Sequence, residues 1–416
     1  MKPVVHFYIL WAVATTAVVA FRNLRNEHST PESVKVSKAA CNFTLNLLKI
    51  LDSKSQSANI AFSPASINIL LSVLQQGARA NTAVELENVL GLSREESKRG
   101  YGPFLKLKKE KNVTLEWGNR CYIKPGMQLN ENFKGVAKRN FDVDVEEMEF
   151  GVPSPQSSAQ TINSWIKDIT HNQIKNLVDP SSISVETIML MVNAIFFKGV
   201  WAKPFRKKKT TVDKFEITSR DSVQTYFMAQ REKYYSGRDT DLGAKWVQQP
   251  FQNGRFAMFY VMPIKRHRLT QLLSKMSGED LHKIFNHFGV NHVKLRIPKF
   301  KVSDKVSLVD TLKKVPNHQT IVSLGLRDIF TSASDLGGIA SSTSLAVSDV
   351  VHQANVEIDE KGGSGSAATV VQFLRMRTPT MTFVADQPFL FFIVDKKTKI
   401  PLFAGKLANP QPYSLS

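Results

Sequence analysis

The sequence EIDEKGGSGSAATVVQFLRMRTPTMTFVADQPF (357–389) joins a run of small residues, a segment with two arginines and the start of a dense apolar strand. The small residues run from Gly362 to Thr369, and the apolar stretch FLFFIV occupies 389–394. A continuous apolar run of this length is typical of a buried strand, whereas small and polar residues are typical of exposed connections. The pattern predicts an exposed, protease-accessible loop between two segments that are built firmly into a sheet.

Around this stretch, the first half of the chain is predicted to be mainly helical and the second half mainly strands. Apolar residues at helical spacing predict a helix over 33–52. Ser63 and Pro64 supply a cap and a first-turn proline for the next helix, and Thr82 and Glu85 have the spacing of a capping box. The predicted strands are 189–201, 292–302, the last two apolar runs of the chain, and a hairpin over 246–263 that turns at Asn253-Gly254.

No linker rich in Pro, Gly or Ser divides the 416 residues, so we expect one α+β domain over 33–410 and a short tail, 411–416. Residues 1–20 have a positive start and an apolar core that ends in small residues, as a secretory signal peptide does. A membrane anchor is the alternative, because the apolar stretch is near the lower limit for spanning a bilayer. Residues 21–32 are polar and expected to be flexible. We therefore expect a secreted, extracellular protein with no membrane span.

The formal net charge of +19 favours polyanionic partners such as sulfated glycosaminoglycans. No nucleic-acid-binding motif accompanies that charge, so nucleic acid is not an expected partner. The two cysteines, Cys41 and Cys121, are too few for a disulfide framework; free buried thiols are expected, with a single bridge as the alternative. Asn42 and Asn112 each begin an Asn-x-Thr motif, which predicts N-linked glycosylation in a secreted protein.

Five stretches of the chain, in order and at matching spacing, resemble motifs of the serpin family. They are FSPASINILLSVLQQGARANT (62–82), NAIFFKGVWAKPF (193–205), LGLRDIFTSASDLGGI (324–339), LAVSDVVHQANVEIDEKG (345–362) and FVADQPFLFFIVDKKTKIPLFAGKLANP (383–410). The resemblance covers about 33–410. It implies three β-sheets, about nine helices and a metastable fold. In that fold an exposed reactive-centre loop, here about 360–382, can insert into the central sheet. We expect a monomer.

The same resemblance assigns a hinge that begins at Glu360. Its further residues are Gly362, Gly363, Ser364, Gly365, Ser366, Ala367, Ala368 and Thr369. No proline lies between Gly362 and Thr378, so every residue there can donate to a sheet ladder. Inhibitory serpins usually carry a Thr or Ser and then an alanine-rich run, but Gly363 and Gly365 stand here. Each glycine costs about 0.5–1 kcal/mol relative to alanine in a strand, which predicts slower insertion.

The reactive bond is predicted within a short arginine-bearing segment. The usual family spacing from the hinge places it after Met376. Arg375 and Arg377 suit a specificity pocket with an acidic floor, because guanidinium pairs with carboxylate through two hydrogen bonds. A cut between Arg377 and Thr378 favours a trypsin-like protease. A chymotrypsin- or elastase-like enzyme that cuts after Met376 or Leu374 is the alternative.

The resemblance also implies a polar cluster under the central sheet that controls its opening. Its members here are Ser63, Ser66, Asn193 and His352, and such buried groups require a connected network of hydrogen bonds. Each residue alone has an ordinary explanation, since Ser63 caps a helix and His352 could be a satisfied core histidine.

Lysines cluster in a region that corresponds to the fourth helix of serpins, which some members use to bind heparin. They are Lys106, Lys108, Lys109 and Lys111, and further basic clusters lie at 206–209 and 265–268. A sulfated polysaccharide would bind them mainly through electrostatics. A simple solvated surface is the equal alternative.

The chain shows no motif of an enzyme's active site, such as a G-x-S-x-G elbow, a zinc-binding H-E-x-x-H or a phosphate-binding loop. The nine histidines have no metal-ligand spacing, so we expect no catalysis, metal or cofactor. Two functions remain open. One is a secreted suicide-type inhibitor of a trypsin-like serine protease, which acts by loop cleavage, acyl-enzyme trapping and strand insertion. The other is a non-inhibitory serpin that acts as a glycosaminoglycan-binding or carrier module.

Overall fold

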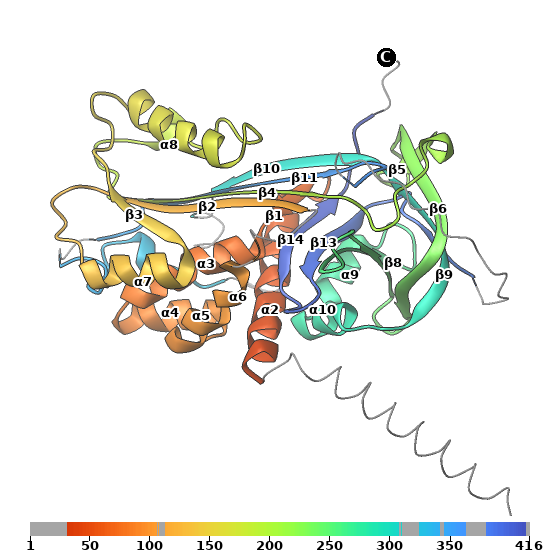
Figure 1. The fold of residues 1–416 in the computed structure, drawn as a ribbon, viewed down its shortest axis with the longest axis horizontal. Helices are drawn as coiled ribbons and strands as arrows, with labels where there is room; N and C mark the ends of the chain where they lie inside the picture. Colours follow the sequence, from red (N-terminus) through yellow and green to blue (C-terminus); the bar gives the residue numbers. More distant parts are fainter. Residues whose placement is uncertain are drawn as a thin grey trace, which may run out of the picture.

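The computed structural model describes residues 31–105, 107, 113–307, 309, 324–341, 345–362 and 380–412. A five-stranded sheet runs across the molecule, with one helix, α8, on its outer face (Figure 1). The other face rests on helices α2 to α7 and on a second, more strongly bent sheet. The predicted α+β class is confirmed.

The described α-helices fall mainly in the first half of the chain, as expected. They are α2 (Pro31–Lys54), α3 (Pro64–Gly77), α4 (Ala80–Leu90), α5 (Arg94–Gly100), α6 (Gly102–Leu105), α7 (Glu131–Phe141), α8 (Pro155–Ile169), α9 (Leu269–Lys275) and α10 (Gly278–Phe285). Single 3-10 turns are η2 (Pro180–Ser182), η3 (Lys207–Lys209) and η4 (Asp328–Phe330). The predicted cap of α3 is confirmed, because the Ser63 side chain accepts from the backbone N–H of Ser66.

The predicted capping box at Thr82 and Glu85 is wrong. Helix α4 already begins at Ala80, with Arg79 at its N-cap position and no side-chain cap. The Glu85 carboxylate accepts instead from the backbone N–H groups of Arg327 and Asp328, and the Thr82 hydroxyl accepts from that of Asp335. Both side chains therefore accept hydrogen bonds from the backbone of a distant loop rather than capping their own helix.

The five-stranded sheet has the order β10-β11-β4-β2-β3. Its strands are β2 (Val113–Ile123), β3 (Val143–Glu147), β4 (Met189–Gly199), β10 (Phe300–Ser307) and β11 (Asp349–Ile358). The central strands β4 and β11 run parallel, and their register sets His352 opposite Asn193. Residues 359–362 follow β11 directly, so the predicted hinge starts at the end of a central strand.

The second sheet has the order β1-β14-β13-β8-β7-β6-β9-β12, with β5 paired to β6. Its strands are β1 (Ile60–Phe62), β5 (Thr211–Glu216), β6 (Ser222–Asp239), β7 (Ala244–Pro250), β8 (Phe256–Pro263), β9 (Val290–Pro298), β12 (Thr380–Val384), β13 (Phe389–Asp395) and β14 (Pro401–Leu407). The long strand β6 pairs with β9 and, through its last residues, with β7. Two of the three expected sheets are therefore hydrogen-bonded into one.

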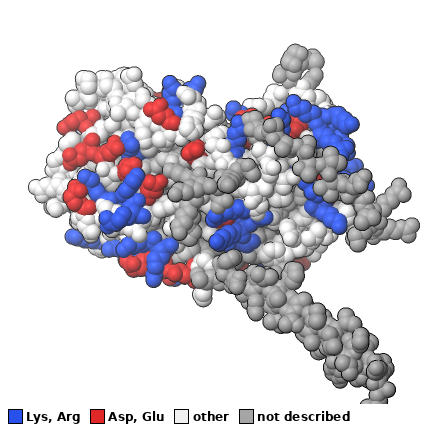
Figure 2. Space-filling model, in the orientation of Figure 1, with Lys and Arg blue, Asp and Glu red and all other residues white. Residues whose placement is uncertain are grey.

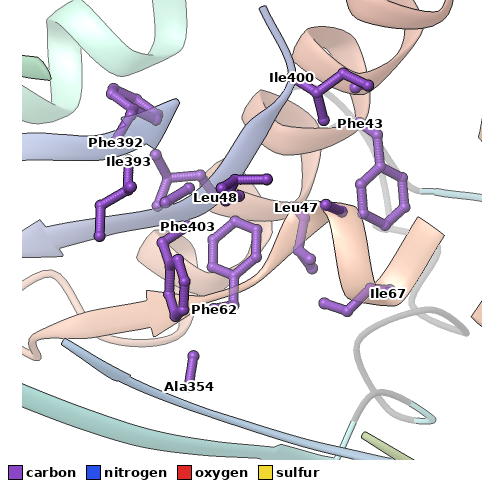
Figure 3. Close-up of a cluster of buried hydrophobic side chains, with 14 of the residues drawn as sticks. Phe43, Leu47, Leu48, Phe62, Ile67, Ala354, Phe392, Ile393, Ile400 and Phe403 are labelled. Carbon is purple, nitrogen blue, oxygen red and sulfur yellow. The ribbon is translucent and has the colours of Figure 1, made fainter. Parts of the chain in front are cut away.

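The core lies between the two sheets and helix α2. Phe43, Leu47 and Leu48 of α2 lie in one buried cluster with Ile393 of β13 and Phe403 of β14, both fully buried (Figure 3). Every residue of β13 is buried, as the FLFFIV stretch predicted. Cys41 and Cys121 are buried, free thiols, which confirms that expectation.

A buried ion pair fixes the C-terminal strand to helix α2. The Lys406 ammonium of β14 contacts the Asp52 carboxylate near the end of α2 and also donates to the carbonyls of Ser55 and Gln56. The side chains of Lys406 and Asp52 are 1% and 7% exposed. A buried charge that loses its partner is strongly destabilising, because neither water nor another charge replaces the partner.

We therefore expect Asp52→Ala to lower the free energy of unfolding by about 3–5 kcal/mol, because it leaves the buried Lys406 charge unpaired. The measurement is urea-induced unfolding at neutral pH. Glu279→Ala removes the partner of Lys38 in a pair whose side chains are 44% and 47% exposed, and serves as the control. The control variant should lose much less stability, because water screens an exposed ion pair. Equal losses in the two variants would contradict the assigned role of the buried pair.

Candidate functional site

The site is the seam between β4 and β11, where a serpin-type loop would have to enter the five-stranded sheet. The two strands pair in parallel from Asp349 opposite Leu190 to Asn355 opposite Phe196. The polar cluster lies across this seam, and the hinge leaves from one end of it. Both features are built from side chains that are far apart in the sequence.

His352 links the seam to helix α3. Its Nε2 accepts a hydrogen bond of 2.9 Å from the backbone N–H of Ser63, and its Nδ1 lies 2.6 Å from Oδ1 of Asn193. Because Nε2 accepts, Nδ1 carries the proton and donates to Asn193. The Ser63 hydroxyl donates to that of Ser66 at 3.0 Å. The structure thus brings all four predicted residues together, and each is fully buried.

The imidazole of His352 is neutral in this network. Burial lowers the pKa of His352 from 6.5 to about 3. The Nε2 position, which a proton would occupy, already accepts from a backbone N–H. Protonation would therefore break the bond between β11 and the start of α3 and leave a charge inside the core.

Asn119 of β2 is a further member that the sequence analysis missed. The Asn193 side-chain amide donates to Oδ1 of Asn119 at 2.6 Å, and Asn119 is 2% exposed. The network therefore spans three adjacent strands, β11, β4 and β2. The available signal was an asparagine inside the buried strand pattern WGNRCY (117–122), where an apolar residue is the usual choice.

Trp201 is buried at the hinge end of the seam. Its ring is 1% exposed and stacks on Phe251 at 4.5 Å between centroids. The indole N–H donates to the carbonyl of Asp359 at 3.0 Å, and the Trp201 backbone N–H donates to that of Lys361 at 2.9 Å. The start of the hinge is thereby tied to the segment that follows β4.

Glu360 adds side-chain anchors at the same place. Its carboxylate accepts from the Thr210 hydroxyl at 2.9 Å and pairs with the Lys299 ammonium at 3.0 Å. Burial acts to raise the pKa of Glu360. Hydrogen bonds from its own backbone, from Lys299 and from Thr210, together with the Lys299 charge, outweigh burial and leave that pKa below the usual value. The carboxylate therefore stays ionised and holds the hinge at neutral pH.

Gly362 allows this close approach. Its φ of +95° lies in the region that favours glycine. A Cβ there would stand 2.6 Å from the carbonyl oxygen of Gly199 and 2.7 Å from the nitrogen of Trp201. The glycine is thus required by the contact between hinge and β4, in addition to its role in the predicted hinge composition.

Helix α8 covers the other end of the seam. Ile162 and Ile166 of α8 belong to a separate buried cluster with Leu190, Val192 and Ala194 of β4 and with Val351 of β11. Asn163 exchanges two hydrogen bonds with the backbone of Val178 in the returning segment. Nearer the hinge end, the side chain of Asn355 in β11 donates to the carbonyl of Gln173, in the segment that follows α8. The sheet cannot open beneath α8 without movement of that helix.

Several predicted site residues lie outside the described residues. These are the hinge residues Gly363, Ser364, Gly365, Ser366, Ala367, Ala368 and Thr369, the reactive-bond candidates Arg375, Met376, Arg377 and Thr378, the lysines Lys106, Lys108, Lys109 and Lys111, and the glycosylation candidate Asn112. Asn42 is exposed on α2, while Thr44 of the same motif is buried and donates to the carbonyl of Ala40. No described helix is long and apolar enough to cross a bilayer.

Comparisons with known proteins agree with this arrangement. The family model described as Serpin (serine protease inhibitor) matches residues 38–410. The chain is similar to serine protease inhibitor 42Dd of Drosophila melanogaster, with 31% identity over 90% of this chain and 98% of that protein. Among solved structures it resembles Manduca sexta serpin-12 (TM-score 0.79, 32% identity, 89% of this chain and 98% of that one). It also resembles human thyroxine-binding globulin (TM-score 0.80, 27% identity, 91% of this chain and 100% of that one).

We expect acid to weaken the fold through His352. Between its folded pKa of about 3 and its unfolded value of 6.5, only the unfolded chain binds the proton. Stability present above pH 6.5 is therefore lost as the pH falls, by about 2–3 kcal/mol at pH 4.5. The measurement is urea unfolding at several pH values for the wild type and for His352→Gln, which cannot titrate. The same pH slope in both proteins between pH 6.5 and 4.5 would refute the assignment.

A methyl group at the hinge should also destabilise the protein. Gly362→Ala combines an unfavourable φ with a clash against backbone atoms, and should lower the free energy of unfolding by about 2–4 kcal/mol. Gly325→Ala is the matched control. Gly325 has a φ of +82° but nothing within 4 Å of its missing Cβ, so about 1 kcal/mol is expected there. A smaller effect at Gly362 than at Gly325 would argue against the tight hinge contact.

Proposed function

The chain belongs to the serpin family, and on that basis we propose that it is a secreted, suicide-type inhibitor of trypsin-like serine proteases. The observation that carries the proposal is the anchored hinge. Glu360 and Gly362 are fixed beside Trp201 at the hinge end of the β4–β11 seam, and a run of small residues without proline follows directly. A cleaved loop that starts there enters the sheet from a fixed position.

The energy for trapping comes from the seam itself. A new strand between β4 and β11 would add on the order of ten hydrogen bonds, each worth about 1 kcal/mol net. That gain is comparable to the whole stability of an ordinary domain. The buried network of His352 and Asn193 holds the seam closed in the uncleaved protein, and it must rearrange when the strand enters.

The proposed reaction follows the acyl-transfer chemistry of the protease. The protease serine attacks the carbonyl carbon of Arg377, the bond to Thr378 breaks, and Thr378 becomes a new amino terminus. The upstream segment, still esterified to the protease through Arg377, inserts into the seam before water can hydrolyse the ester. The protein supplies no catalytic group, in keeping with a family of inhibitors rather than enzymes.

A non-inhibitory binding or carrier module is the second candidate. Gly363 and Gly365 favour it, because glycine slows strand formation and would allow the protease to finish hydrolysis. The likeness to thyroxine-binding globulin also favours it. For this candidate the proposed partner is a heparin-like glycosaminoglycan. It would bind Lys106, Lys108, Lys109 and Lys111. Removal of residues 1–20 on secretion and glycosylation of Asn42 and Asn112 belong to both candidates.

Incubation with trypsin tests the inhibitor function. We expect a covalent complex that survives denaturing electrophoresis, and a released C-terminal peptide whose mass begins at Thr378. Arg377→Ala should reduce complex formation at least tenfold, because it removes the charge that the pocket recognises. Arg375→Ala is the control and should form the covalent complex as the wild type does. A peptide that begins at Arg377 would assign the cut to Met376.

The melting temperature separates the two candidates further. Insertion should raise the midpoint of the cleaved protein by about 10 °C. About ten hydrogen bonds supply about 10 kcal/mol, and an unfolding entropy of about 2.1 cal/mol/K per residue gives about 1 °C per kcal/mol for 416 residues. Cleavage without a complex and without any rise in melting temperature would favour the carrier module instead.

A further inference from the structure

Two pairs of basic side chains face each other across the outer surface of β6 and β9. In the antiparallel register, Arg231 stands opposite Lys294 and Lys233 stands opposite His292. Arg231, Lys233 and Lys294 are all exposed. Lys and Arg side chains gather over this end of the molecule in the space-filling view (Figure 2). We call Arg231, Lys233 and Lys294 the β6–β9 basic cluster.

This arrangement works against the stability of the sheet. Directly opposed residues of an antiparallel pair have Cβ atoms about 5 Å apart, and like charges at that distance are destabilising. Within the described part of the chain, none of the three cations forms an ion pair with a carboxylate. Neighbouring charges are satisfied, since Lys203 pairs with Glu232 and Arg296 with Asp213. Among the described residues, the cluster therefore has no compensating carboxylate.

The cluster lies beside the strand that follows the reactive loop. Strand β12 begins at Thr380 and pairs with β9, where Thr382 is next to Lys294. Arg377 precedes Thr380 by three residues, so chain length alone keeps it within about 11 Å of that strand. Successive strands are about 4.8 Å apart, which brings β6 within about 10 Å of β12. A protease docked on the proposed bond must extend over these strands.

We propose that the β6–β9 basic cluster is a second docking surface for the target protease, and that it selects enzymes with acidic residues on the rim of the active site. The inference rests on the inhibitor function proposed above. Three cations that lack a carboxylate partner in the described part of the chain attract an acidic surface during encounter, and contact with it relieves their mutual repulsion. Such charges act mainly on the rate of association, which is the quantity that decides how fast an inhibitor captures its protease.

The test uses anionic and cationic trypsin, which share a preference for arginine and differ in net charge. Rate constants of loop cleavage at low salt are measured for the full-length wild type and for R231E/K294E. We expect the wild type to react faster with anionic trypsin. In the double variant, the rate constant of cleavage by anionic trypsin should fall about tenfold. The rate constant with cationic trypsin should stay the same or rise. High salt should remove most of the difference.

The matched control is R220E/K275E, which changes the net charge by the same amount. Both residues are exposed; Arg220 lies in the turn before β6, and Lys275 ends α9. This variant should leave the ratio of the two rates unchanged within about twofold. The proposal would be overturned if R231E/K294E also left the ratio of the two cleavage rate constants unchanged. Loss of heparin affinity in that variant with an unchanged ratio would reassign the cluster to a sulfated polysaccharide.

A single substitution distinguishes docking from folding. R231E places a carboxylate opposite Lys294 and turns a repulsive pair into an attractive one. Its melting temperature should stay equal or rise, while its reaction with anionic trypsin slows about threefold. Unchanged kinetics in R231E would contradict the proposal. The rate of loop cleavage is measured whether or not a covalent complex forms. Cleavage without a complex would refute the inhibitor function, while its rate would still report on docking.

Discussion

The parallel ladder between β4 and β11 holds the five-stranded sheet together at its centre. Two parallel central strands are held together by their ladder, by the bond from His352 to Asn193 and by the link from His352 to the start of α3. The same strands form the place where another strand would gain a full set of partners. In the proposed mechanism, the closed seam therefore stabilises the uncleaved protein and opposes its conversion to the inserted form.

The two ends of the seam are secured by different means. At the hinge end, Trp201, Glu360 and Gly362 form a compact set of hydrogen bonds, an ion pair and a close backbone contact. At the far end, apolar side chains of α8 spread over β2, β4 and β11. Polar contacts are directional and break one at a time, whereas an apolar cover must move as a unit.

Local patterns in the sequence predicted much of this, and long-range partners account for what they missed. Ser63 could be identified as a cap because its helix begins with the next residue, and the serpin-like motifs brought Ser66, Asn193 and His352 into one cluster. The capping box predicted at Thr82 and Glu85 was wrong because both side chains bind a loop more than 240 residues away. The spacing of residues within a helix carries no information about such a partner. The partnership of Asn119 and the opposition of Arg231 and Lys294 depend on strand register, which no single segment encodes.

In the proposed mechanism, the cover provided by α8 gives strand insertion a fixed order. An arm that starts at Glu360 meets the end of the seam near Asn355 and Phe196 first, and reaches Val351 and Leu190, which pack against α8, only later. The final steps of such an insertion would require α8 to move, because its apolar side chains cover Val351 and Leu190. The rate of complete insertion would then depend on the packing of one helix as well as on the entering loop.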